Sequence, residues 1–125
     1  MVHLANLDDT ISVLDQLDED VAPVVLVNVF TVDPEEIDEV LAAWTRDAAF
    51  MQQQPGFVRT QLHRGIGGSS TLMNYAVWES VAAFRAAFEH PQFRRQIESY
   101  PESAVSRPHL FSAVAVPGIC RDSIQ

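Results

Sequence analysis

The chain has 125 residues, of which 47% are hydrophobic and 20% charged, and 17 Asp and Glu against 8 Lys and Arg give it a net charge of −9. This size and composition indicate one globular domain with its own hydrophobic core rather than a disordered chain. The negative charge repels phosphate backbones and anionic lipids, so neither nucleic acid nor a membrane is expected as a partner.

The cysteine count and the N-terminal sequence indicate in which cellular compartment the protein is expected. Cys120 is the single cysteine, which excludes an internal disulfide framework and favours a reducing environment. The N-terminus lacks the basic and apolar regions of a secretory signal, and no apolar run is long enough to span a bilayer. We therefore expect a cytoplasmic protein.

Three segments are predicted from the distribution of charge and of Pro and Gly. Residues 1–22 form an acidic N-terminal extension in which Ile11, Leu14 and Val21 could build a short helix or clasp. Pro23 begins a compact domain that spans residues 23–118 and closes with Pro117 and Gly118. Residues 119–125 form a C-terminal tail.

The compact domain begins with a strand followed by a helix. The β-branched and aromatic run 24–31 predicts a buried strand. Asp33 as an N-cap acceptor and Pro34 in the first turn predict a helix start. Apolar residues then recur at helical spacing as far as Met51, and Pro55 with Gly56 ends the helix.

Two further strands and a second helix follow. Residues 57–64 and 71–78 predict strands, and the glycine-rich segment 65–70 precedes a strand rather than a helix, which favours a hairpin turn over a phosphate-binding loop. Ser80 is predicted to cap a helix that ends at His90-Pro91, with one more helical segment around Phe93 and Ile97.

A linker over residues 101–108 and a last strand over residues 109–116 complete the chain. The resulting order, β-α-β-β-α-β, predicts an α+β fold with a ferredoxin-like sheet whose two helices cover one face. The other face of the strands at 24–31 and 71–78 is apolar as well. Since such a face is too hydrophobic to leave in water, we expect a homodimer packed sheet against sheet.

Three polar side chains interrupt these apolar strands. Asn28 lies in the first strand, and Asn74 and Trp78 project from one face of the third. Because the first and third strands of this fold are neighbours, the two carboxamides can approach each other. Their N–H groups could stabilise the charge of an enolate oxygen, and the indole could stack on a planar ring or donate its N–H.

Aromatic residues of the two helices could wall a flat cavity over these groups: Trp44, Phe50, Phe84 and Phe88. His109, and also His63, could act as an acid or base because each lies on or beside a strand. The four histidines and Cys120 lack the spacing of metal ligands, so no metal site is predicted. The alternative, that the asparagines pair with each other or with the backbone and Trp78 is only core, stays open.

These residues resemble the antibiotic biosynthesis monooxygenase family over about residues 24–116. The resemblance is carried by Asn28, Asn74, Phe93, the Pro55-Gly56-Phe57 turn and the run from Trp78-Glu79-Ser80 to Phe84. It implies a homodimeric α+β barrel built from two ferredoxin-like sheets. Phe84 and Glu98 stand where some members of the family have a tyrosine and an arginine.

The resemblance also implies a reaction. Oxygenases of aromatic polyketide pathways in this family oxidise anthrones to quinones without metal or flavin, using two asparagines and a tryptophan placed like Asn28, Asn74 and Trp78. It implies that Asn28 and Trp78 help to activate substrate and oxygen and that Asn74 holds the anionic oxygen. A branch that degrades haem is disfavoured, because Ala87 and Ile97 stand where its pocket tryptophan and its haem-ligating histidine would be.

The sequence therefore supports two main hypotheses. The leading one is a cofactor-independent monooxygenase that oxidises a planar phenolic, anthrone-like or quinol-like compound with O₂. Its rival is a binding or stress-response module that has kept the fold and lost turnover. An open cavity reached by both carboxamides favours the enzyme, whereas mutual pairing of Asn28 and Asn74 in a filled core favours the module.

Overall fold

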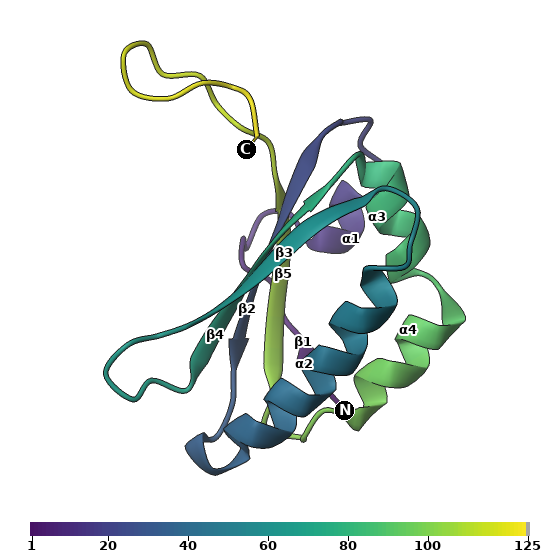
Figure 1. Ribbon diagram of the computed structural model, residues 1–125, viewed down its shortest axis with the longest axis vertical. Helices are drawn as coiled ribbons and strands as arrows, with labels where there is room; N and C mark the ends of the chain where they lie inside the picture. Colours follow the sequence, from purple (N-terminus) through teal and green to yellow (C-terminus); the bar gives the residue numbers. More distant parts are fainter. Residues whose placement is uncertain (125) are drawn as a thin grey trace.

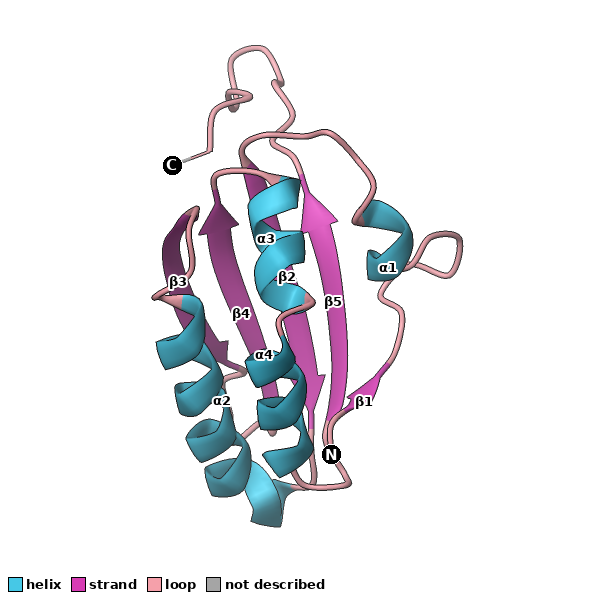
Figure 2. Cartoon of the chain, turned by 90° about the vertical axis from the view of Figure 1, so that its right-hand side faces the viewer, coloured by secondary structure: helices cyan, strands magenta, loops and turns pink. Residues whose placement is uncertain are grey.

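The computed structural model describes residues 1–124, which form one sheet with helices against one of its faces (Figures 1 and 2). The strands are β1 (His3–Leu4), β2 (Val24–Thr31), β3 (Phe57–Arg64), β4 (Thr71–Trp78) and β5 (Val105–Phe111). The helices are α1 (Val13–Gln16), α2 (Ile37–Met51), α3 (Val81–Phe88) and α4 (Pro91–Gln96), with 3₁₀ turns at Pro34–Glu36 and Ile97–Ser99.

The strand order is β1-β5-β2-β4-β3. The four long strands are antiparallel to their neighbours, and β1 pairs in parallel with β5. Helices α2, α3 and α4 lie in front of the sheet in Figure 2 and cover one face. The predicted α+β fold is confirmed, with one additional edge strand. None of the helices within residues 1–124 is long and apolar enough to cross a bilayer.

The helix starts agree only in part with the sequence signals. Ser80 caps α3 as predicted, since its Oγ accepts a hydrogen bond from the Ala83 N–H at 3.0 Å. Asp33 makes no capping bond with its side chain. Its N–H instead donates to Ser103 Oγ at 3.1 Å, and a 3₁₀ turn at Pro34–Glu36 leads into α2.

Gly56 ties the turn before β3 to the start of α3. Its φ of +86° lies in the left-handed region, and a Cβ at this position would clash with the Cβ of Ala83. The Gly56 carbonyl also accepts a hydrogen bond from the Glu79 N–H at 2.8 Å. A glycine is therefore needed at position 56, where the turn before β3 packs against the start of α3.

The last strand was predicted at the wrong residues. The structure places β5 at Val105–Phe111 rather than at 109–116, so most of the predicted linker belongs to the strand. Pro108 had argued against a strand because proline has no N–H to donate. That missing donor faces the outer edge of the sheet, where β1 no longer pairs and where Gln16 Oε1 accepts from the Leu110 N–H at 2.8 Å.

The acidic N-terminal segment is part of the folded domain. β1 extends the sheet through bonds from the His3 N–H to the Ala104 carbonyl (2.9 Å) and from the Ala5 N–H to the Ser106 carbonyl (2.8 Å). Val13 and Leu17 of the α1 region are buried in the core. Leu14, which the sequence had suggested as part of a short helix or clasp, lies in α1 but is 52% exposed.

Unlike the N-terminal segment, the described residues after β5 do not pack into the domain. Beyond β5 the chain leaves the body of the molecule as an arm, drawn in yellow in Figure 1. A bridge between Val116 and Cys120 closes a small loop within it. The side chains of Val114 and Ile119 are exposed.

Candidate active site

A cavity of about 370 Å³ lies between the sheet and the helices. This volume is within the range of about 300–1,000 Å³ that is typical of sites for small organic ligands. Strands β2, β4 and β5 provide its floor, and α2, α3 and α4 provide much of its wall. Most of the lining residues are apolar, as in sites for hydrophobic small molecules.

Asn28 and Asn74 are directly opposite each other on the floor of this cavity, as register partners across β2 and β4. The carbonyl oxygen of Asn28 accepts a hydrogen bond from Ser106 Oγ at 2.8 Å, and that of Asn74 accepts one from Thr60 Oγ1. An amide whose oxygen is already engaged offers its NH₂ group as a donor. The two hydroxyls thus fix both carboxamides as donors to a guest molecule.

Trp78 is the third polar group of the cavity. Its side chain is 1% exposed and is held edge-on by Phe57 and Phe84, at ring centroid distances of 5.3 and 5.8 Å. The buried indole Nε1 has no hydrogen-bond partner among residues 1–124. Since buried donors are nearly always paired, this N–H is an exception, and it belongs to a residue that lines the cavity.

The aromatic wall matches the sequence prediction in part. Trp44, Phe84 and Phe88 line the cavity, whereas Phe50 and His109 do not. Phe50 lies at the far end of α2 and packs against His90, with ring centroids 5.0 Å apart. His109 is the register partner of Val27, which places it on the sheet face opposite the asparagines.

Further cavity residues were missed from the sequence. Ser106 and Thr60 could not be paired with the asparagines without the strand register. Asp47 and Tyr100 also line the cavity, and both are buried. Asp47 did carry a signal, because it lies three residues after Trp44 and four before Met51, within the apolar stripe of α2.

Burial shifts the pKa values of Asp47 and Tyr100. Desolvation raises the pKa of Asp47 to about 6, although the Tyr100 hydroxyl and the charge of Arg46 act in the opposite direction. Desolvation, together with the nearby Asp47 carboxylate, also raises the pKa of Tyr100 above its usual range. At neutral pH the cavity therefore holds a carboxylate beside a neutral phenol.

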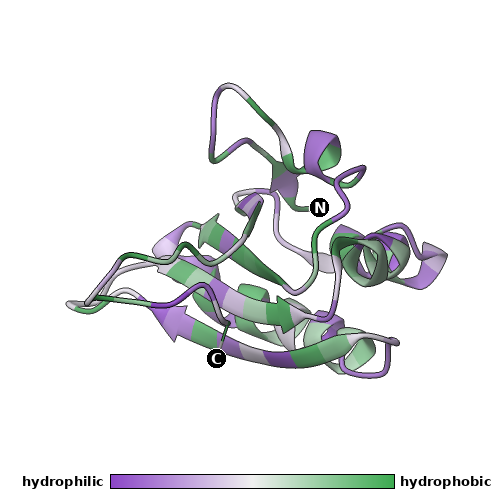
Figure 3. Cartoon of the chain, turned by 90° about the horizontal axis from the view of Figure 1, so that it is seen from above, coloured by the Kyte–Doolittle hydropathy of each residue, from purple (hydrophilic) through white to green (hydrophobic). Residues whose placement is uncertain are grey.

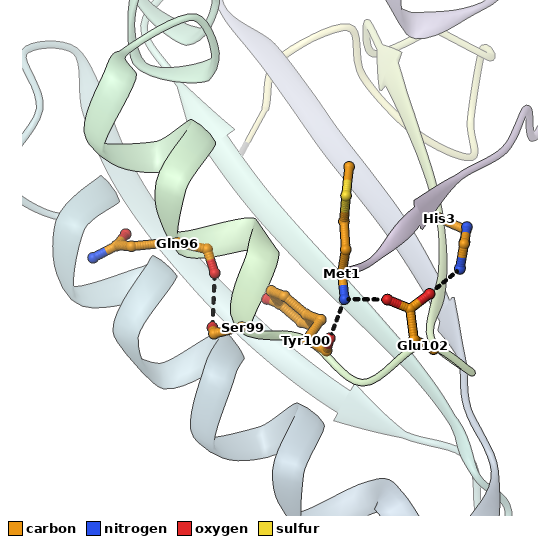
Figure 4. Close-up of polar contacts among 6 residues, drawn as sticks. All are labelled: Met1, His3, Gln96, Ser99, Tyr100 and Glu102. Atoms are coloured by element: carbon orange, nitrogen blue, oxygen red, sulfur yellow. Dashed lines mark hydrogen bonds and ion pairs between the residues drawn. The ribbon is translucent and has the colours of Figure 1, made fainter.

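The N-terminal segment completes one side of the cavity. Residues 1–4 are among its lining, and they are held at the 3₁₀ turn that follows α4 (Figure 4). The Val2 N–H donates to the Ile97 carbonyl at 3.2 Å, and His3 Nε2 lies 3.1 Å from the Glu102 carboxylate. This segment, interpreted from the sequence as an extension, is a structural part of the site.

The arrangement combines an apolar space with N–H donors on its floor. Two NH₂ groups and one indole N–H can stabilise negative charge on an oxygen of a bound ring system, and the low polarity of the walls strengthens that interaction. In the part of the chain that the structure describes, no group of three or more His, Cys, Asp or Glu residues could hold a metal ion.

Fold and cavity together define an α+β domain with an apolar cavity between its sheet and its helices, and comparison with known proteins gives its family. The family model for antibiotic biosynthesis monooxygenases matches residues 23–99. The chain therefore belongs to the antibiotic biosynthesis monooxygenase family, a class of oxidoreductases. Residues 1–22, which contribute to the sheet and the cavity, lie outside the matched range.

Two curated relatives are monooxygenases from Streptomyces. Deoxynogalonate monooxygenase of Streptomyces nogalater is 39% identical over 96 residues, which are 75% of this chain and 79% of the relative. Tetracenomycin-F1 monooxygenase of Streptomyces glaucescens is 36% identical over 104 residues, which are 74% of this chain and 88% of the relative.

Solved structures agree with this placement. SnoaB, a cofactor-independent oxygenase from Streptomyces nogalater, superposes with a TM-score of 0.67 at 34% identity, over 78% of this chain and 99% of that protein. A protein of Shewanella loihica superposes with a TM-score of 0.66 at 31% identity, over 78% of this chain and 99% of that protein.

Proposed function

We propose that this protein is a cofactor-independent monooxygenase that oxidises a planar phenolic, anthrone-like or quinol-like compound with O₂ to a quinone. The observation that carries the proposal is the cavity in which Asn28, Asn74 and the unpaired indole N–H of Trp78 meet. For an anthrone-like methylene the overall change is CH₂ + O₂ → C=O + H₂O, which balances without a further reductant.

Each side chain has a stated task in this proposal. The NH₂ groups of Asn28 and Asn74 stabilise the oxygen on which negative charge develops when the substrate loses a proton, and the Trp78 N–H assists at the reacting end. Trp44, Phe84 and Phe88 enclose the ring system and exclude water. The electron-rich substrate anion can itself transfer an electron to O₂, so the protein supplies orientation and electrostatic stabilisation.

The rival hypothesis, a binding module without turnover, requires a filled core in which the asparagines satisfy each other. The cavity and the two separate hydroxyl partners of the asparagines support the enzyme instead.

Oxygen uptake tests the proposal. Protein dialysed against a chelator is mixed with anthrone, and we expect consumption of one O₂ for each quinone formed. Asn28→Ala should lower kcat by about 10²-fold, because it removes a preorganised donor to the developing oxyanion. Trp78→Phe should also lose activity, whereas Asn6→Ala, at an exposed asparagine, should behave like the wild type. Equal rates for all four proteins would refute the assignment.

We also propose that the protein is a homodimer that pairs through the uncovered face of the sheet. Apolar side chains remain partly exposed on this face. Figure 3 shows the hydrophobic residues of the strands in green. The partly exposed side chains are Val27, Val29, Met73 and Tyr75. The exposed Val114 and Ile119 of the projecting arm could then cover part of a second copy.

Light scattering tests the dimer. We expect a mass about twice the 13.9 kDa of one chain for the wild type. Tyr75→Asp should shift the protein to the monomer, because it places a charge within the apolar face. Ile66→Asp, at a tip that is 96% exposed, should leave the mass unchanged. A monomeric wild type at micromolar concentration would contradict the proposal.

A cytoplasmic location, expected from the single cysteine, remains a prediction.

A further inference from the structure

Asp47 is a charged residue where α2 should be apolar. It lies on the same face of the helix as Trp44, Ala48 and Met51, and all four line the cavity. Its side chain is 6% exposed, and among the described residues that line the cavity it provides the single carboxyl group. The side chain of Asp47 therefore borders the space that a ligand would occupy.

The carboxylate has no ion-pair partner that would explain its burial. Its Oδ1 is buried without a hydrogen bond from any residue of the described chain. The neighbouring cations are engaged elsewhere: the Arg46 guanidinium donates to Ser99 Oγ at 3.0 Å, the Arg94 guanidinium lies 5.0 Å above the Phe88 ring, and His3 pairs with Glu102. Tyr100 is the remaining titratable group that faces it.

A buried carboxylate without a cation is costly to the fold, so a structural role alone does not account for it. An unpaired oxygen beside a substrate cavity is instead what a general base requires. Desolvation also raises the pKa of Asp47 to about 6, so the group is both ionised and more basic than an exposed aspartate near neutral pH.

We propose that Asp47 is the base that removes the proton from the substrate in this cavity. The inference rests on the proposed oxygenase function and assigns the proton acceptor of that reaction. The C–H bond of the substrate breaks, its proton goes to the carboxylate of Asp47, and the electron pair stays on the substrate anion, whose oxygen is stabilised by Asn28 and Asn74.

The later steps return the proton. The substrate anion reacts with O₂ to form a carbon–oxygen bond and a peroxide anion, which takes the proton held by Asp47. Loss of the second C–H proton, with cleavage of the O–O bond, then yields the carbonyl group and water. Over the whole cycle two C–H bonds and one O₂ become one C=O bond and one H₂O, and the carboxylate is regenerated.

An anaerobic titration isolates the proton-transfer step from the reaction with oxygen. Wild-type protein mixed with anthrone at pH 7.5 without O₂ should convert the bound molecule to its enolate, seen as a long-wavelength absorption band. Asp47→Asn, which keeps the size of the side chain but accepts no proton, should bind anthrone and leave it in the keto form. Asp38→Asn, at an exposed position of the same helix, is the matched control and should form the enolate.

The aerobic rate gives a second measurement. For the wild type, kcat/KM should rise with pH through an inflection near the raised pKa of Asp47. Asp47→Asn should be slower by about 10²-fold at pH 7.5 and should lack this inflection. Asp47→Glu should recover part of the rate, because it restores a carboxylate one methylene further along.

The outcomes separate this proposal from the oxygenase assignment. An enolate formed equally by the wild type and Asp47→Asn would overturn the role of Asp47 while leaving the oxygenase in place. A wild type that consumes O₂ but forms no enolate without it would overturn Asp47 as the base. A wild type that neither ionises anthrone nor consumes O₂ with it would overturn both.

Discussion

Replacing Phe84 with alanine is expected to lower the free energy of unfolding by about 3–5 kcal/mol. Phe84 is 1% exposed and lies between Trp78 and Phe88, with ring centroids 5.8 and 5.5 Å away. Since it also borders the cavity, the space left by the ring would join an existing hollow that the surrounding residues cannot easily fill.

Denaturant unfolding at one fixed protein concentration measures this loss. Ile66→Ala is the control, because its side chain is 96% exposed and surface substitutions of this kind change stability by about 0.5 kcal/mol or less. If Phe84→Ala cost less than about 1 kcal/mol, Phe84 would not be part of a rigid wall. The cavity would then be able to close around the missing ring.

Most of the secondary structure could be predicted from local signals. Strands β2, β3 and β4 each combine β-branched or aromatic residues with clear turn residues at their ends, and α2 has an apolar stripe that Asp47 alone interrupts. β5 could not be placed in this way. Proline normally interrupts a central strand, so Pro108 argued against a strand at this position. It is accommodated in β5 because its missing N–H faces the outer edge of the sheet, and this edge is known only once the sheet is assembled.

The contribution of the N-terminal segment could not be predicted for a related reason. Its acidic composition indicates an exposed extension, whereas its attachment to the domain depends on backbone bonds from His3 and Ala5 and on two buried side chains, Val13 and Leu17. Backbone hydrogen bonds carry no sequence signal. A two-residue strand is also too short for any periodicity to be recognised.

The sequence pointed to a candidate site where polar residues interrupted the apolar pattern of a strand. Asn28, Asn74 and Trp78 stood out because polar groups are costly in buried strands. Phe50 and His109 were wrongly expected at the cavity, because helical spacing does not say how far along the helix the cavity extends. The face of a strand residue such as His109 also depends on the register of the whole strand.

The thermal and chemical stability of Asp47→Asn should exceed that of the wild type at neutral pH, and the difference should depend on pH. The pKa of Asp47 is raised from 3.8 to about 6 in the folded protein. The unfolded chain therefore releases its proton more readily, and the wild type loses stability as the pH rises from about 4 to about 6. The expected change across this window is about 3 kcal/mol.

The pH series separates this contribution from those of the other carboxyl groups. The pKa of Glu102 is lowered by the N-terminal ammonium and by His3, so that group stabilises the fold above its unfolded pKa and weakens it as the pH falls. Because the wild type and Asp47→Asn share Glu102, the difference between their unfolding free energies cancels it. This difference should grow from pH 4 to pH 6 and stay constant above. Parallel curves for Asp47→Asn and the wild type would mean that the Asp47 carboxylate is not desolvated in the native protein, and that the fold carries no energetic cost for holding a base against the cavity.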